Sequence, residues 1–406
     1  MPVAEPCGTS GYGGWERDRP GEHPYQGLAP GTPRRGPRSV AIPTTVRRTI
    51  ALRSGQGATR MRPRCVLVTG VSRPLGAQVA AAFAADPEIE NVIGVDTISP
   101  RDDLGRTQFV RADIRNPLIA KVIGAAAVDT VLHLNVIATP LGAGGRTVMK
   151  EINVIGTMQL LAACQKAPSV TKVIVKSTTT IYGSSPRDPA LFTEEMEPRG
   201  LPRGGYSKDA FEVEGYVRGF SRRRPDITVS VLRFTNIVGP GIDSPLTRYL
   251  ELPVVPTVLG FDPRLQLLHS EDALGVLVKA AVDHHPGTFN VAGDGVLLLS
   301  QAIRRAGRAP LPVPSPAVVT FGNLVRRSRL LDFSAEQLGF LAHGRAVDTT
   351  RLKHVFGYVP RFTTLETFDD FVRDRPMRCT IDRDAVFRLE RSLVGVLARR
   401  RLVGTS

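Results

Sequence analysis

Two apolar runs joined by a glycine-containing segment limit the possible folds of this chain more than any other feature. Residues 65–69 form the first run, Gly70 and Gly76 follow it, and residues 92–96 form a second run that ends in Asp96. The pattern predicts a buried strand, a tight turn, a helix and a second strand. Amides at such a helix N-terminus bind a pyrophosphate, and a carboxylate at the second strand end accepts hydrogen bonds from ribose hydroxyls. The stretch therefore predicts a dinucleotide site.

Strand and helix patterns alternate along most of the chain. We expect strands over 65–69, 91–96, 107–110, 129–134, 171–177, 227–234 and 287–291, and helices over 75–86, 147–167, 206–223 and 270–283. Several of these strands are continuous Val, Ile and Leu runs, which is typical of a parallel sheet covered on both faces. The sequence therefore predicts an α/β fold of the Rossmann type, doubly wound around a parallel sheet, with a smaller C-terminal substrate-binding lobe.

Composition divides the chain into three expected parts. Residues 1–60 hold ten Gly and eight Pro without lasting periodicity, which predicts a disordered extension, or a segment upstream of a start at Met61. Residues 61–377 should form the folded domain, and residues 378–406 a basic amphipathic tail with a helix over 385–401. The substrate lobe should come mainly from segments 184–205, 239–268 and 308–377.

The net charge of +15 is spread unevenly, with +5 in residues 1–60, +4 in residues 378–406 and +6 between them. Because 45 Arg stand against eight Lys, we interpret this charge as solubility and arginine usage. Basic residues are not interleaved with aromatic ones, so no nucleic-acid partner is expected. A weak peripheral membrane contact through the tail stays open. No apolar run reaches the length of a membrane span, and no signal-peptide pattern occurs. The cysteine usage fits a reducing, cytoplasmic setting.

The cysteines predict neither disulfides nor a metal site. Cys7, Cys65, Cys164 and Cys379 lie far apart, with no CxxC pair and no His at metal-binding spacing. Cys65 and Cys164 fall on apolar faces and should be small core residues in a reducing compartment.

Seven short motifs follow one another between about residues 64 and 372. They are Thr69-Gly70-x₅-Gly76, Asp113 within Arg-Ala-Asp-Ile-Arg, Asn153-Val-Ile-Gly-Thr157, Ser177-Thr-Thr-Thr-Ile-Tyr182-Gly, Ser207-Lys208-x₃-Glu212, Leu232-Arg-Phe-Thr-Asn236-Ile-Val-Gly-Pro240 and His269-Ser-Glu-Asp272. Together they resemble the extended short-chain dehydrogenase/reductase family, in its NAD-dependent epimerase/dehydratase group. That group includes UDP-glucose 4-epimerase, and the chain looks like an actinobacterial branch of such proteins.

The resemblance implies a set of cofactor-binding residues. They are Thr69, Gly70, Arg73, Leu75, Gly76, Asp96, Asp113, Ile114 and Lys208. Arg73 stands where the family usually has a second glycine, so it narrows the backbone approach but offers a guanidinium to a phosphate. It leaves NADP open, whereas Asp96 would repel a 2′-phosphate and favours NAD. His133, inside a strand, is interpreted as a packed core residue.

The catalytic pattern of the family is altered in this chain. Family members use a Tyr four residues before a Lys, with a Ser or Thr that orients the substrate oxygen. Lys208 and Thr178 match, but Gly204 occupies the Tyr position and Tyr206 lies two residues later, roughly 200° away on a helix. Three hypotheses stay open: the loop brings Tyr206 into the site, another group such as Tyr182 or water takes the proton, or the site is a silent scaffold.

The substrate side is less well defined. Asn236 resembles the family residue that contacts a nucleotide-sugar, but it also suits a turn before Pro240. Arg264 lies one residue before the position where UDP-sugar enzymes place an arginine. In a strand, a shift of one residue points the side chain to the opposite face. Residues 254–260 are apolar, which suits a less polar substrate.

The resemblance implies an NAD-dependent isomerase or oxidoreductase that oxidises a secondary alcohol, by default on a nucleotide-sugar. The alternatives are a dehydrogenase or isomerase of a steroid- or lipid-like alcohol, and a silent NAD-binding regulator. The resemblance also implies a homodimer formed through helices 147–167 and 206–223.

Overall fold

The computed structural model describes residues 62–138, 144–198, 205–314 and 335–375. All of them belong to one of the two units into which the chain divides, residues 37–406. The predictions for the extension 1–60, for Gly204 and for the tail helix 385–401 lie outside the described residues.

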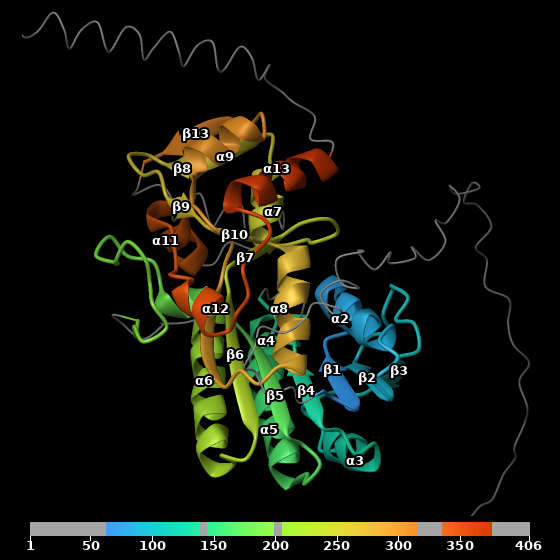
Figure 1. The fold of residues 1–406 in the computed structure, drawn as a ribbon. Helices are drawn as coiled ribbons and strands as arrows, with labels where there is room; N and C mark the ends of the chain where they lie inside the picture. The colour runs from blue at the N-terminus through green and yellow to red at the C-terminus, as the bar shows by residue number, and fades with distance from the viewer. Residues whose placement is uncertain (1–61, 139–143, 199–204, 315–334, 376–406) are drawn as a thin grey trace, which may run out of the picture. The chain divides into compact units, whose positions relative to one another are not determined.

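A seven-stranded sheet forms the centre of the domain, in the order β11-β6-β5-β4-β1-β2-β3 (Figure 1). Its strands are β1 (Cys65–Thr69), β2 (Asn91–Asp96), β3 (Gln108–Arg111), β4 (Thr130–His133), β5 (Lys172–Thr178), β6 (Thr228–Phe234) and β11 (Gly287–Val291). Every neighbouring pair is parallel. The predicted strands are confirmed to within one residue at each end. The strand order reverses between β1 and β4, and ligands of such sheets bind in the crevice at that point.

Helices cover both faces of the sheet, as the continuous apolar strands predict. One face packs against α2 (Pro74–Ala84) and α8 (Ser270–Val282), the other against α3 (Leu118–Ala125), α5 (Thr157–Lys166) and α6 (Gly205–Arg223). Within β5, Ile174 faces α2 and α8, whereas Val173 and Val175 face the other three helices. The doubly wound α/β fold is confirmed.

The helix predicted over 147–167 consists of three parts. α4 (Arg146–Lys150) continues into a π-helical segment (Glu151–Gly156) and then into α5. A π turn changes the direction of the side chains relative to an α-helix. Here it allows the Asn153 amide to bind the chain after β4: the Ile137 N–H donates to Asn153 Oδ1 at 2.7 Å, and Asn153 Nδ2 donates to the Ile137 carbonyl at 2.9 Å.

A second lobe consists of three two-stranded sheets and short helices. The strand pairs are β7 (Asn236–Val238) with β10 (Leu267–His269), β8 (Val254–Val258) with β13 (Ala309–Val313), and β9 (Arg264–Leu265) with β12 (Leu297–Leu298). The helices outside the central layers are α7 (Pro245–Leu250), α9 (Leu299–Arg305), α11 (Ala335–His343), α12 (Thr350–His354) and α13 (Thr364–Asp374). An apolar cluster joins α7, α9 and α13 to these strands, so residues 297–306 contribute alongside the predicted lobe segments.

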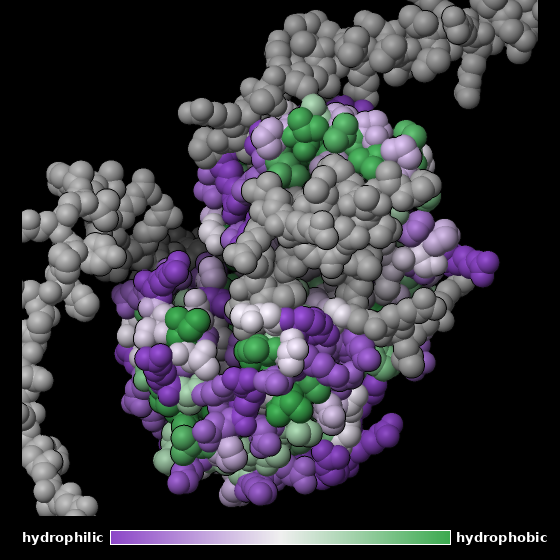
Figure 2. All heavy atoms as spheres, turned by 180° about the vertical axis from the view of Figure 1, so that it is seen from behind, coloured by the Kyte–Doolittle hydropathy of each residue, from purple (hydrophilic) through white to green (hydrophobic). Residues whose placement is uncertain are grey.

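Cys65 and Cys164 are buried and unpaired, which confirms them as core residues. Within the described ranges no helix is long and apolar enough to cross a membrane. In the same residues no group of three or more His, Cys, Asp or Glu forms a candidate metal site. Figure 2 shows hydrophilic side chains over much of the described surface on one face, with hydrophobic ones in small groups between them.

A buried ion pair joins β6 to α6. Arg233 Nη2 lies 2.7 Å from Glu214 Oε2, and the two side chains are only 9% and 3% exposed. Ser177 of β5 donates to Glu214 Oε1 at 2.6 Å, and Arg233 Nη1 donates to the Tyr182 hydroxyl at 2.7 Å. Both charges are therefore compensated, and the network links the end of β5 to α6.

Replacing Arg233 by Ala should lower the free energy of unfolding by about 3–5 kcal/mol, because buried Glu214 would keep only the exposed Arg218 guanidinium, 3.9 Å away, as a cationic neighbour. The matched control is Arg305→Ala, whose ion pair with Asp369 has side chains 40% and 39% exposed and should contribute less than about 1 kcal/mol. Urea denaturation of both variants measures the difference. Equal losses would contradict this view of the buried pair.

Candidate active site

The turn between β1 and α2 requires both of its glycines. Gly70 has a φ of +85°, and a Cβ there would lie 3.1 Å from the backbone of Asn135. A Cβ on Gly76 would lie 2.2 Å from the Gly70 carbonyl oxygen, so no larger residue fits without a backbone shift. Arg73 is the N-cap of α2, Pro74 begins the helix, and no side chain caps its first turn. Its amides, those of Leu75 and Gly76 among them, thus suit an anionic ligand.

Thr69 and His133 fasten β1 to β4 below this turn. The Thr69 Oγ1 accepts hydrogen bonds from the amides of Leu134 at 3.1 Å and Asn135 at 3.2 Å, and it lies 2.9 Å from His133 Nδ1. The other ring nitrogen of His133 lies 2.8 Å from Thr157 Oγ1. Burial, together with the charge of Lys176, lowers the pKa of His133 to about 4. His133 is therefore a packed core residue, as interpreted from its place in a strand.

Asp96 lies at the end of β2 and holds the turn residue Ser72. Its Oδ2 accepts hydrogen bonds from the Ser72 hydroxyl at 2.6 Å and the Ser72 amide at 3.0 Å, while Oδ1 accepts from the Thr97 amide at 2.8 Å. Arg73, next along the turn, is partly buried. Burial lowers the pKa of Arg73, against the charges of Asp96 and Tyr206 that raise it.

Asp113, after β3, is paired with an arginine. Arg115 Nη2 lies 2.6 Å from Asp113 Oδ2, and Arg115 Nη1 also contacts Glu151 at 2.8 Å. Hydrogen bonds from Arg115 hold the pKa of Asp113 below its usual range. The neighbouring Ile114 is buried, and a Cβ on Gly156 would lie 2.7 Å from its Cδ1. Asp113 and Ile114, both predicted to bind the cofactor, thus stand beside the π-helical segment.

Thr178 and Tyr206 meet at the carboxyl end of β5. Thr178 is 7% exposed, and its hydroxyl accepts a hydrogen bond from the Thr180 amide at 3.2 Å. Tyr206 is the second residue of α6, and Gly205 before it has a φ of +68°. Burial raises the pKa of the Tyr206 phenol to about 12, against a hydrogen bond from Thr178 and the charge of Arg73. The structure thus brings Tyr206 to Thr178.

The first turn of α6 is fixed by a buried carboxylate. Asp209, 0% exposed, accepts hydrogen bonds from Arg146 Nη1 at 2.6 Å and Nη2 at 2.7 Å. Arg146 Nη2 also donates to the Gly205 carbonyl at 2.9 Å. These bonds set where α6 starts, and hence where Tyr206 lies.

Lys208 and Tyr182 differ in what surrounds them. Lys208 is partly exposed, and its ammonium makes no hydrogen bond or ion pair with any described residue. Tyr182 lies in the 3₁₀ helix Thr179–Tyr182, is 2% exposed, and donates to Asn290 Oδ1 at 2.8 Å. Because its hydroxyl also accepts from Arg233, Tyr182 is part of the buried ion-pair network, not of the cleft.

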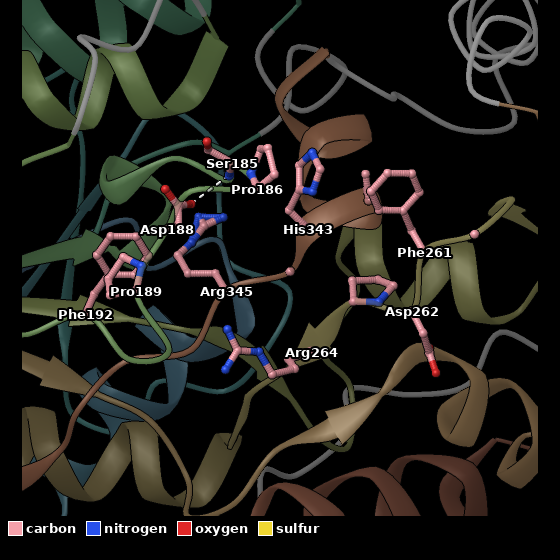
Figure 3. A pocket seen from close by; sticks show the side chains of 14 residues that line it. Ser185, Pro186, Asp188, Pro189, Phe192, Phe261, Asp262, Arg264, His343 and Arg345 are labelled. Atoms are coloured by element: carbon pink, nitrogen blue, oxygen red, sulfur yellow. Dashed lines mark hydrogen bonds between the residues drawn. The ribbon is translucent and has the colours of Figure 1, made fainter.

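A pocket of about 270 Å³ lies beside Arg264 (Figure 3). It is lined by Ser185, Pro186, Asp188, Pro189, Phe192, Gly260, Phe261, Asp262, Pro263, Arg264, Ala342, His343, Gly344 and Arg345. Leu265 is fully buried in the lobe core, so its neighbour Arg264 takes the face that meets the pocket. Asn236 is only partly buried in β7, paired with Leu267 of β10, and does not line this pocket.

Arg345 is a pocket residue that sequence reasoning missed. Its side chain is largely buried at 9% exposure, and Nη1 donates to the Thr179 carbonyl at 3.2 Å. The pocket wall is therefore bonded to the residue that follows Thr178. His343 and Asp188 were also missed, because no motif or spacing rule marks the segments that carry them.

A sequence profile of the NAD dependent epimerase/dehydratase family matches residues 66–292, and the chain belongs to that family. Family membership confirms the predicted resemblance and the predicted NAD cofactor. An uncharacterized protein of Mycobacterium tuberculosis is 50% identical over 341 residues, which cover 83% of this chain and 91% of that protein. A UDP-glucose 4-epimerase of Yersinia pestis is 30% identical over 138 residues, 32% of this chain and 38% of that enzyme.

Solved structures share the fold. The UDP-glucose 4-epimerase of Thermotoga maritima, with UDP-glucose, has a TM-score of 0.60 at 19% identity and covers 76% of this chain and 98% of its own. The UDP-glucuronic acid 4-epimerase of Bacillus cereus, with UDP-glucuronic acid and NAD, has a TM-score of 0.58 at 18% identity, covering 76% and 99%. The Rossmann-type architecture is thus that of the predicted family.

Gly76→Ala should lower the free energy of unfolding by about 1–3 kcal/mol, because the new methyl group overlaps the Gly70 carbonyl. Gly124→Ala in α3 is the matched control, since a Cβ there meets nothing within 4 Å. It should stabilise the protein by about 0.5–1 kcal/mol. Thermal and urea melts measure both; a neutral Gly76→Ala would show that α2 can move away from β1.

Proposed function

We propose that this protein is an NAD-dependent enzyme that oxidises a secondary alcohol of a nucleotide-sugar, and that return of the hydride to the opposite face completes an epimerisation. The observation that carries the proposal is the contact between the Tyr206 phenol and the Thr178 hydroxyl at the edge of the sheet. It supports an active enzyme over a silent scaffold, because a proton acceptor and an orienting hydroxyl stand together.

Several residues suit the dinucleotide. The uncapped first turn of α2 would hold the pyrophosphate, with Arg73 beside it. Asp96 would receive the adenosine ribose, since a carboxylate has about four acceptor sites and Ser72 and Thr97 use only part of them. Asp113 and Ile114 would flank the adenine, and Lys208, without a described partner, would hold the other ribose. When bound, NAD accepts a hydride from the carbinol carbon and returns it.

Tyr206 would take the proton of the substrate hydroxyl while Thr178 orients the oxygen. The pKa of Tyr206 is raised by burial, so the enzyme needs a positive charge nearby to make the phenolate accessible. Arg73 supplies such a charge in the structure. In this arrangement the proton acceptor, Tyr206, lies two residues before Lys208, whereas the family tyrosine lies four residues before its lysine.

The pocket beside the site favours an anionic substrate over a steroid- or lipid-like one. Arg264 and Arg345 both line it, and Arg264 makes no ion pair with any described residue. The two carboxylates of the lining already accept hydrogen bonds, Asp188 from the Ser185 amide and Asp262 from Ser300. Two guanidinium groups suit the diphosphate of a nucleotide-sugar, with Asn236 as a further contact nearer the sheet. Nucleotide-sugars bound to the structural neighbours support the same class.

We further propose a cytoplasmic homodimer that pairs through residues 147–167 and 206–223, with at most weak membrane contact through the basic tail 378–406. Apolar side chains stand exposed on both helices of the proposed interface, with Ile155 at 40% and Tyr216 at 41% exposure.

The test is turnover of UDP-sugars by the purified protein with NAD, followed by product chromatography. Tyr206→Phe should lower kcat by about 10²–10⁴-fold, the usual loss for a positioned acid/base, while calorimetry finds NAD affinity unchanged. Lys121→Met, at an exposed position of α3 outside the site and the proposed interface, is the control and should keep full activity. NAD binding without turnover of UDP-sugars or 3-hydroxysteroids would favour the scaffold; turnover of the steroids alone would overturn the substrate class.

The rate should rise with pH between about 7 and 9. The acceptor is the phenolate, and the raised pKa of Tyr206, about 12, leaves the phenol protonated at neutral pH, so each increase in pH enlarges the reactive fraction. A pH profile of kcat for the wild type and for Tyr206→Phe measures this, and the variant should lose the rise with pH. A wild-type profile without slope in this range would assign the proton to another group.

A further inference from the structure

Lys176 lies on the same strand as Thr178, two residues nearer the sheet interior. Its register is fixed, because the preceding Val175 pairs with His133 of β4. Side chains alternate along a strand, so Lys176 and Thr178 point to the same face as Ile174, the face covered by α2 and α8. Lys176 thus stands directly below the group proposed to orient the substrate oxygen.

A second lysine on this strand, Lys172, has hydrogen-bond acceptors for its ammonium and serves as a comparison. Lys172 points to the same face, and its Nζ donates to the carbonyls of Ala281 at 2.5 Å and Asp283 at 2.9 Å at the end of α8. Lys176, four residues on, makes no hydrogen bond or ion pair with any described residue. The residue is only partly exposed, so water does not replace those partners fully.

The charges around Lys176 do not compensate it either. Two titratable groups interact electrostatically with Lys176: Arg73, from the turn before α2, and His133, from β4. Burial, together with the charge of Arg73, lowers the pKa of Lys176 to about 8. A lysine held beside another cation, without an acceptor, is costly unless a ligand completes its surroundings.

The proposed NAD site brings one half of the dinucleotide over Lys176. With adenosine over β2 at Asp96 and the pyrophosphate at the start of α2, the other half would continue across β4 toward β5. Neighbouring strands are about 4.8 Å apart, which makes β5 about 10 Å from β1. Lys176 and Thr178 are separated by about 7 Å along the strand, a distance that a lysine side chain spans.

We propose that Lys176 contacts the nicotinamide half of bound NAD and that its charge favours the reduced over the oxidised cofactor. The inference rests on the proposed NAD site. The oxidised ring carries a positive charge, and the hydride, with its two electrons, removes that charge. A neighbouring ammonium therefore disfavours the oxidised form alone. The substrate carbon loses the hydride more readily as a result, while the hydroxyl proton goes to Tyr206.

The experiment is calorimetric titration of the full chain with NAD and with NADH, without substrate. Lys176→Met should raise the ratio of the NADH to the NAD dissociation constant roughly tenfold, because it removes one charge near the ring. Lys176→Arg keeps the charge and should keep the wild-type ratio. Lys121→Met, at an exposed site on α3, is the matched control and should change neither constant. Lys176→Gln repeats the test with a polar neutral side chain should the Met variant fold poorly.

Three results would overturn the inference. An unchanged ratio with unchanged affinities would show that Lys176 does not reach the cofactor. Equal weakening of NAD and NADH would assign Lys176 to the phosphates or ribose. If the wild-type protein binds neither dinucleotide, the proposed function is overturned and this inference with it. If the wild type binds both and Lys176→Met leaves the ratio of the two dissociation constants unchanged, this inference alone is overturned.

Discussion

The contact between Gly76 and the Gly70 carbonyl is the constraint on which the rest of the site depends. At 2.2 Å from that oxygen there is no room for a Cβ, so α2 rests on the end of β1 as closely as backbone allows. This closeness aims the first-turn amides of α2 at the crevice between β1 and β4. It also brings Ser72 within hydrogen-bond distance of Asp96, which ties the turn to β2. Loosening one contact would therefore disturb the phosphate side and the ribose side together.

Most of the central fold could be predicted because its local signals agree with one another. Val66 and Leu67 belong to a strand buried on both faces, and such strands lack alternation, so their limits follow from where the apolar run stops. The π-helical segment could not be predicted in this way. The two ends of the helix predicted over 147–167 each show ordinary α-helical apolar spacing, and this spacing does not reveal an extra residue between them. Residues 297–306 escaped notice because short elements of a lobe carry little periodicity.

The site divides along the same line between local and tertiary information. The turn glycines, Asp96 and Thr178 are marked by local motifs, and each lies where its strand or turn predicts. The position of Tyr206 depends instead on where α6 begins, which the bonds from Arg146 to Asp209 and Gly205 decide. Sequence spacing alone left that question open. Arg345 comes near the site only through tertiary packing and belongs to no recognisable motif. Lys176 lies on β5 two residues before Thr178, but no motif marks it.

The π-helical segment has a consequence for how this protein tolerates change. Its surplus residue shifts the phase of the helix, so Asn153 can bond the chain after β4 while Leu160 and Cys164 of α5 remain in the core. Deleting one residue would restore regular winding and rotate the preceding turn by about 100°. Many substitutions on the outer side of this helix leave its winding unchanged. Deletion of a single residue would instead break the hydrogen bonds between Asn153 and the chain after β4. Length, more than composition, is what natural variation must preserve there.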